Sequence, residues 1–282
     1  MTSSIEDDTI KKTKIVPNFK SFNLYDFNVY DGNLKNDDQE KSSFISYKDN
    51  KKFIIQAFAI NSTGKSVCII INDFNPFFYI KVDDNWNESD KSEFIADLRK
   101  RMGNYYEDSI VDSKLIKRQK LNMFDNMKLH NFIKISFQNT ASYNKAKKLF
   151  YIDTINFGVF NRSLIKEGYK YKDKHLFLYE GTIPPLLKLF HIREISPSGW
   201  IMVSNNKIKT INNKTTHCTY EYNIGYKDLK PLNKDASVKY NICSFDIEAS
   251  SSHGDFPLPI KTYKRLAMNI VDVFMRMMKS SQ

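Results

Sequence analysis

Residues 239–250 read KYNICSFDIEAS, an apolar run that ends in two carboxylates. The run predicts a buried β-strand, and because side chains alternate along a strand, Asp246 and Glu248 would lie on one face of it. Hard divalent cations prefer carboxylate oxygens, and a two-metal nuclease uses such ligands to hold its ions about 3.5–4 Å apart. An isolated Asp-x-Glu is more often an acidic strand end that faces water, so the pattern alone leaves both interpretations open.

The sequence around this pair carries a family resemblance. Residues 244–259, SFDIEASSSHGDFPLP, place the turn Gly254–Pro257 shortly after the carboxylates. This string closely resembles the first exonuclease motif of family B DNA polymerases, in which an apolar strand ends in Asp-Ile-Glu and a Gly-x-Phe-Pro turn follows. Upstream, VCIIINDFNPFFYIKV at 67–82 and LYEGTIPPLLKLFHIREISPSGWI at 178–201 resemble two amino-terminal segments of the same family. The versions in large DNA viruses of eukaryotes, and the delta-like cellular polymerases, are the most similar.

The resemblance implies a role for each part of the chain. Asp246 and Glu248 would be catalytic residues and ligands of Mg²⁺ or Mn²⁺ in an RNase H-like 3′–5′ proofreading exonuclease. Asp246 would bridge two ions, and Glu248 would hold the ion that carries the attacking water. The preceding region would be the amino-terminal domain that contacts DNA, both the template and the single-stranded 3′ end. In this family it commonly combines an OB-like barrel with an RRM-like αβ module.

The chain ends at Gln282, before the later exonuclease carboxylates and the polymerase motifs of the family. It is therefore predicted to be a portion of a DNA polymerase that works in DNA replication and is inactive alone. A carboxy-terminal polymerase fragment is a candidate partner, and no residue points to a particular processivity factor. The alternative is a non-catalytic module that binds single-stranded nucleic acid. A stand-alone RNase H-like nuclease is less favoured, because one strand and one helix cannot make that fold.

The predicted fold class is α+β, with mainly antiparallel strands and short helices. A turn at Asn61–Gly64 separates two apolar runs and predicts a hairpin. Helical spacing of apolar residues indicates helices over 89–102 and 140–150, and a third helix begins with Pro184 and Pro185 in its first turn. The expected domains are a flexible arm at 1–20, a DNA-binding amino-terminal domain at 21–236, and an incomplete exonuclease domain at 237–282.

Composition favours a folded protein that meets a polyanion. Lys and Arg number 43 against 32 Asp and Glu, which gives a net charge of +11. Such a charge favours nucleic acid, although the Lys-rich and Asn-rich composition typical of AT-rich coding would also raise it. No membrane-spanning run is found, and three widely spaced cysteines suit a reducing compartment. The expectation is a soluble intracellular protein, at work either in the nucleus or at a cytoplasmic site of viral replication.

Several other side chains have both a functional and a structural interpretation. Four aromatic residues that follow Asp73 could stack on bases, but strand alternation would bury about half of them in a core. Two basic segments could contact phosphates, although such segments are usually solvated surface. His253 could touch substrate or simply lie in a solvated loop, and Trp200 is interpreted as packing. The aromatic residues are Phe74, Phe77, Phe78 and Tyr79, and the basic segments are Lys114–Lys120 and Lys147–Lys148.

The last segment, TYKRLAMNIVDVFMRMMKSSQ, predicts an amphipathic helix from a Thr262 cap to about Lys279. An apolar stripe of this size needs a partner surface, so self-association is expected unless the stripe is covered. The stripe consists of Leu266, Ala267, Ile270, Val271, Phe274, Met277 and Met278.

Overall fold

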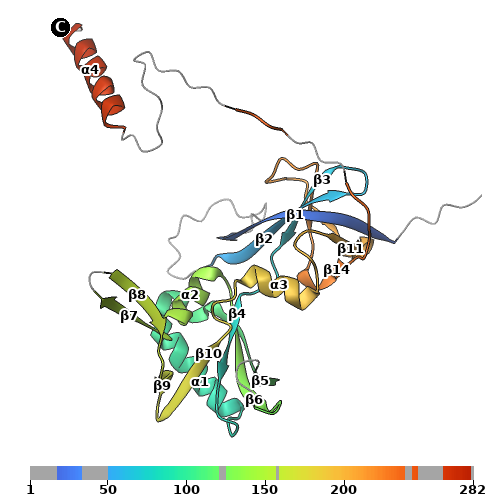
Figure 1. Ribbon diagram of the computed structural model, residues 1–282, viewed down its shortest axis with the longest axis vertical. Coiled ribbons are helices and arrows are strands. Elements are labelled where there is room, and N and C mark those ends of the chain that lie inside the picture. The colour runs from blue at the N-terminus through green and yellow to red at the C-terminus, as the bar shows by residue number, and fades with distance from the viewer. Residues whose placement is uncertain are drawn as a thin grey trace, which may run out of the picture. The chain divides into compact units, whose positions relative to one another are not determined.

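The computed structural model describes residues 18–33, 50–120, 125–156, 159–238, 243–246 and 263–280 (Figure 1). The chain divides into two compact units, Met1–Lys239 and Tyr240–Gln282. The first unit contains two large sheets, and the second contains one helix among its described residues. The coarse expectation of an α+β protein rich in antiparallel strands is confirmed.

The first sheet has seven strands in the order β12-β13-β3-β2-β1-β11-β14. Its neighbours pair antiparallel except β13 and β3, which run parallel. The predicted hairpin turn is present, because the Asn61 side chain accepts hydrogen bonds from the backbone of Thr63 and Lys65. The strands are β1 (Phe19–Gly32), β2 (Lys52–Asn61), β3 (Ser66–Ile71), β11 (Trp200–Ser204), β12 (Lys209–Thr210), β13 (Tyr220–Asn223) and β14 (Lys230–Pro231).

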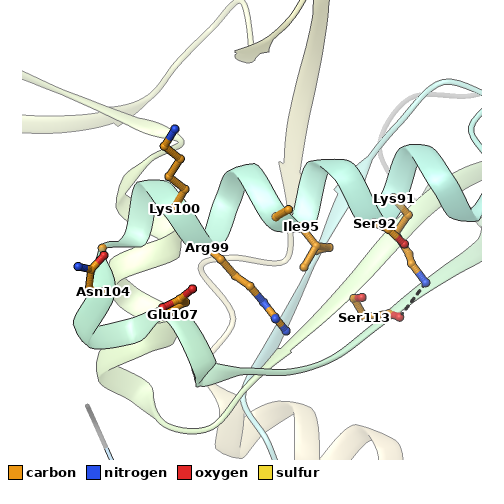
Figure 2. Close-up of a pocket in the computed structure, with 10 residues that line it drawn as sticks. Lys91, Ser92, Ile95, Arg99, Lys100, Asn104, Glu107 and Ser113 are labelled. Carbon is orange, nitrogen blue, oxygen red and sulfur yellow. Dashed lines mark hydrogen bonds between the residues drawn. The ribbon is translucent and has the colours of Figure 1, made fainter. Parts of the chain in front are cut away.

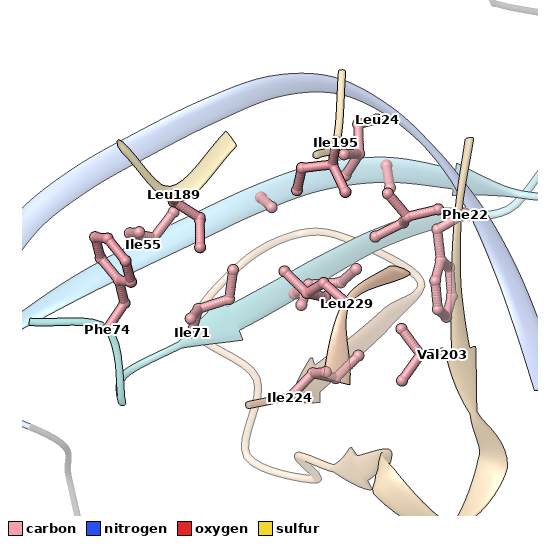
Figure 3. Close-up of a cluster of buried hydrophobic side chains, with 14 of the residues drawn as sticks. Phe22, Leu24, Ile55, Ile71, Phe74, Leu189, Ile195, Val203, Ile224 and Leu229 are labelled. Atoms are coloured by element: carbon pink, nitrogen blue, oxygen red, sulfur yellow. The ribbon is translucent and has the colours of Figure 1, made fainter. Parts of the chain in front are cut away.

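Apolar side chains from several of these strands form one buried cluster (Figure 3). Phe22 and Leu24 of β1 meet Ile55 of β2 and Ile71 of β3 there. Helix α3 (Pro185–Arg193) adds Leu189 to the cluster, and Glu194 ends the helix in a left-handed conformation with φ of 54°. Two short 3-10 turns, η2 (Asn205–Lys207) and η3 (Tyr226–Asp228), connect the later strands.

The second sheet has five strands in the order β5-β6-β4-β10-β9. Two helices lie between its strands in the chain, α1 (Glu88–Met102) and α2 (Thr140–Lys148), which agree with the predicted helices to within two residues. Asn87 begins α1 with a capping box that it shares with Asp90. A 3-10 turn, η1 (Asn104–Ser109), precedes β5. A separate hairpin is formed by β7 (Tyr151–Asn156) and β8 (Val159–Leu164). The strands of the sheet are β4 (Phe77–Lys81), β5 (Ile110–Gln119), β6 (Leu129–Phe137), β9 (Tyr169–Tyr171) and β10 (Lys174–Tyr179).

The two sheets are joined by polar contacts near the amino end of α2. The Asp31 carboxylate, at the end of β1, accepts hydrogen bonds from the backbone N–H groups of Thr140 and Ala141 at 2.9 and 3.0 Å. The Phe53 N–H donates to the Gln138 carbonyl at 2.9 Å. A carboxylate at a helix amino terminus is favoured by both the free N–H groups and the helix dipole. The first sheet therefore caps a helix of the second.

The predicted strand over 239–250 is not found in the part of it that is described. Residues 243–246 have no assigned secondary structure, and the Phe245 side chain is 80% exposed. A strand is held by hydrogen bonds to a neighbouring strand, and no described residue supplies a neighbour for this segment. The prediction of a buried strand is therefore wrong for these residues, while the rest of the segment lies outside the described ranges.

Candidate functional site

Of the two predicted metal ligands, Asp246 and Glu248, the structure describes only the first. Asp246 is exposed and lies in the described segment 243–246, which has no regular secondary structure, and Glu248 lies outside the described residues. His253 and the turn Gly254–Pro257 lie outside them as well. Within the described ranges, no group of three or more His, Cys, Asp or Glu side chains could hold a metal ion. One carboxylate does not complete the oxygen shell that Mg²⁺ requires, so the described residues do not form the predicted site by themselves.

Helix α4 (Lys264–Ser280) follows as predicted, although the predicted cap, Thr262, is outside the described residues. Its apolar stripe is well exposed: Leu266, Ile270 and Phe274 are 54%, 61% and 60% accessible. No described helix is long and apolar enough to cross a membrane.

The aromatic residues of the segment at 74–79 divide between core and surface. Phe74, Phe77 and Phe78 are buried in the two hydrophobic clusters, so the packing interpretation is confirmed for them. Tyr79 is only partly buried. Trp200 also packs: its indole N–H donates to the Ala236 carbonyl at 2.7 Å, and the Lys234 ammonium lies 3.9 Å from the ring centroid.

A buried lysine beside these aromatic rings was not predicted from the sequence. Lys188 of α3 is 4% exposed, and its ammonium donates a 2.6 Å hydrogen bond to the Phe77 carbonyl. Burial lowers the pKa of Lys188 to about 8, although the Glu180 carboxylate 3.6 Å away acts in the opposite direction. The Lys134 ammonium lies 4.1 Å from the Phe77 ring centroid, and burial lowers the pKa of Lys134 as well. Positive charge is thus concentrated at one end of β4.

A polar groove runs along α1 and faces β5 (Figure 2). Its volume is about 640 Å³, and Lys91, Arg99 and Lys100 give it a positive lining that Glu107 offsets in part. The Lys91 ammonium donates to the Ser113 carbonyl at 3.3 Å and pairs with Glu88, and the Arg99 guanidinium donates to the Ile110 carbonyl at 3.1 Å. These cations hold the helix against the strand, so the groove is interpreted as a structural junction.

The two predicted basic segments differ in how they are presented. On β5, Lys114, Lys117 and Arg118 are all exposed, whereas Lys147 of α2 is partly buried with its ammonium 5.5 Å from the Tyr143 ring centroid. Burial lowers the pKa of Lys147. The segment on β5 therefore remains the better candidate for contacts with phosphate.

Comparisons with known proteins agree with the motif at 244–259. The family model of the exonuclease domain of family B DNA polymerases matches residues 176–271, a range that contains Asp246 and Glu248. A DNA polymerase of Phaeocystis pouchetii virus is 59% identical over 94% of this chain, and one of Pyramimonas orientalis virus is 29% identical over 80%. Over most of its length the chain is therefore similar to family B DNA polymerases.

The chain spans a quarter or less of the length of these relatives, 25% of the first and 18% of the second. Among solved structures, the family B DNA polymerase of the archaeon Pyrobaculum calidifontis aligns with a TM-score of 0.43 and 14% identity, over 76% of this chain and 21% of that one. The sequence matches carry the similarity to this family.

Proposed function

We propose that this chain forms the DNA-contacting amino-terminal region and the first exonuclease segment of a family B DNA polymerase that acts in DNA replication. The observation that carries the proposal is the exonuclease match over 176–271, which includes both carboxylates of the Asp-Ile-Glu motif. The 59% identity to a viral DNA polymerase over 94% of this chain supports the same function.

The proposal assigns domains to the sheets. Residues 1–20 would be an arm, and 21–236 the amino-terminal domain, with the seven-stranded sheet as its OB-like part. The second sheet would be its RRM-like part, because β4-α1-β5-β6-α2-β10 follows the β-α-β-β-α-β order of that module, with β7, β8 and β9 inserted between α2 and β10. Residues 237–282 would begin the RNase H-like exonuclease domain.

Asp246 and Glu248 would act as metal ligands and catalytic carboxylates in this domain. The bound Mg²⁺ or Mn²⁺ ions would activate a water molecule and stabilise the leaving oxygen of the phosphodiester. The contribution of this chain is the pair of carboxylates that hold the ions, and DNA with a single-stranded 3′ end is the substrate. Further carboxylates would have to come from other residues, since no described cluster of three or more supplies them.

The test is a comparison of the chain alone with a chimaera. The purified chain should not degrade single-stranded DNA in the presence of Mg²⁺, because the ions would be under-coordinated. In the chimaera, this chain replaces the matching quarter of the Phaeocystis pouchetii virus polymerase. Exonuclease activity should be present there and lost in both Asp246→Ala and Glu248→Ala, while polymerase activity is retained.

Asp255→Ala is the matched control, because it removes a nearby carboxylate outside the Asp-Ile-Glu motif and should leave exonuclease activity intact. Degradation by the isolated chain that disappears in Asp246→Ala would contradict the incompleteness of the site. Full exonuclease activity in both chimaera variants would reject the assigned ligands.

A binding role without catalysis is the second candidate, supported by the net charge of +11 and the exposed cations of β5. It predicts micromolar binding of single-stranded DNA that weakens steeply as salt rises, as expected of sequence-independent phosphate contacts. Binding without salt dependence would count against it.

A further inference from the structure

The five-stranded sheet presents two faces of opposite character. Phe78 and Ile80 of β4 and Ile133 and Ile135 of β6 are fully buried in the cluster that includes Phe94 of α1. Because side chains alternate along a strand, the residues between them project from the other face. This second face, called here the open face, presents Tyr79, Lys81, Lys114, Ile116, Arg118, Phe132, Lys134, Phe177 and Tyr179. Phe77, Ser136 and His130 of the same face are buried, and at the Phe77 end the face packs against the first hydrophobic cluster, which Tyr79 also contacts.

Strand register brings these residues together in rows. Lys114 of β5 lies opposite Lys134 of β6, and Lys134 lies opposite Tyr79 of β4. Tyr79 in turn lies opposite Tyr179 of β10. A second row runs from Ile116 through Phe132 and Lys81 to Phe177. Aromatic and basic side chains are therefore interleaved across four neighbouring strands.

The aromatic rings of the open face support one another. Phe132 is 3% exposed and meets the rings of Tyr179 and Tyr79 edge-on, with centroids 5.2 and 6.4 Å away. Both tyrosines are partly exposed, and Phe177 is 41% exposed. Phe132 thus acts as a buried support, and the three other rings provide the accessible surface.

The charge of the open face is positive and near the rings. Burial raises the pKa of Tyr79; the negative charge of Glu180 acts in the same direction, and the positive charge of Arg118 acts against the rise. Asp112 is the acidic residue on the same face of β5, and its carboxylate is already 3.3 Å from the Lys114 ammonium. Glu180, just after β10, lies 3.6 Å from the Lys188 ammonium. An anionic partner would therefore meet an excess of cations.

We propose that the open face is a binding platform for single-stranded nucleic acid. Two or three bases would stack on Phe177, Tyr179 and Tyr79, and the phosphates between them would contact Arg118, Lys114 and Lys134. Four-stranded sheets of RNA-binding modules stack two or three bases on aromatic side chains, and here β10 and β4 supply the accessible rings. The platform rests on the proposed function and specifies where its amino-terminal region would contact a strand. DNA and RNA share the chemistry that these residues recognise.

The platform can be tested with the full chain and labelled homopolymers, deoxythymidylate and uridylate of about 20 nucleotides each. Binding is measured by fluorescence anisotropy over a series of salt concentrations. Phe177→Ala should weaken binding at least about fivefold, the lower end of the loss of one base stack. Arg118→Ala should weaken binding and reduce the slope of log K against log salt by about one.

Matched controls lie elsewhere on the same unit. Lys117 is the exposed neighbour of Arg118 that projects from the other side of β5, and Tyr105 is an aromatic residue that is 48% exposed outside the sheet. Lys117→Ala and Tyr105→Ala should each change affinity less than about twofold. Circular dichroism and thermal melting of the four variants establish that each is folded.

The outcomes separate the platform from the proposed polymerase function. A loss of affinity in Phe177→Ala and Arg118→Ala but not in the controls supports the platform, and the tighter of the two homopolymers identifies DNA or RNA as its ligand. Equal affinities of all folded variants would overturn the platform. Loss of exonuclease activity in the Asp246→Ala chimaera would stand whichever result is obtained here.

Discussion

Helices α1 and α4 have similar lengths and similar apolar periodicity, but they differ in what the structure does with their apolar faces. Phe94 and Leu98 of α1 are fully buried against the second sheet. Ile270 and Phe274 of α4 are 61% and 60% exposed. The comparison teaches that periodicity predicts a helix and its apolar face, whereas the surface that covers this face depends on residues far away in the sequence.

The largest expected effect is the change in association state when the exposed apolar stripe of α4 is removed. Burial of its exposed apolar area between two copies would contribute several kcal/mol at about 25 cal/mol per Å². The full chain should therefore self-associate in size-exclusion chromatography with light scattering, and a version that ends at Pro259 should be monomeric. The double variant Ile270→Asp and Phe274→Asp should also be monomeric at full length.

Asp272→Asn is the control for this experiment, because Asp272 lies on the side of α4 opposite the apolar stripe and the change should leave the association state unaltered. Monodisperse monomers of both the full chain and the shortened version would mean that the stripe is covered within one chain.

The next largest effect measures the difference between the two helices directly. Phe94→Ala opens a cavity in the second core and should lower the free energy of unfolding by about 3–5 kcal/mol. In dilute solution, where the chain is monomeric, Phe274→Ala on α4 should change it by less than about 0.5 kcal/mol, as expected for an exposed side chain. Urea unfolding of both variants, monitored by the fluorescence of Trp86 and Trp200 in the first unit, provides the values. Equal losses would abolish the distinction between the helices.

The smallest expected effect is the pH dependence of stability that the buried side chain of Lys188 causes. Burial lowers the pKa of Lys188 from 10.5 to about 8, so the unfolded chain binds more protons between these values and stability should rise with pH there. Burial raises the pKa of Cys68 from 9.0 to about 12. Above pH 9.0 the thiol therefore ionises in the unfolded chain first, which lowers the stability of the fold as pH rises. Wild type should therefore be compared with Lys188→Met between pH 7 and about pH 9.

Above about pH 8, the wild type should gain stability relative to Lys188→Met by on the order of 1 kcal/mol per pH unit. Lys148→Met, which changes an exposed lysine of α2, should show no such pH-dependent difference from wild type. A constant difference between wild type and Lys188→Met at every pH would mean that Lys188 keeps its ordinary pKa.

The sequence predicted those elements whose signals are local. The Asn61–Gly64 turn and the apolar spacing after Ser89 indicated β2, β3 and α1 with bounds close to those observed. The segment 243–246 was wrongly predicted as a strand. An apolar run with alternating side chains forms a strand only when a neighbouring strand supplies the hydrogen-bond partners of its backbone.

The candidate sites show the same division. The motif that contains Asp246 could be identified from residue order alone, and the family match agrees with it. Lys188 could not be identified, because its burial results from α3 lying over the Phe77 ring, 4.5 Å from the ammonium. The open face was also missed, since it depends on the register of four strands that lie far apart in the chain.

The contact between Asp31 and α2 has a mechanical consequence. Its carboxylate ties the end of the longest described strand to two amides of a helix that belongs to the other sheet. A rotation of one sheet against the other would have to break both charge-assisted bonds together and leave a helix end without its anion. We therefore expect the two sheets to move as one rigid body. A nucleic-acid strand bound to one sheet would then keep a constant orientation relative to the other.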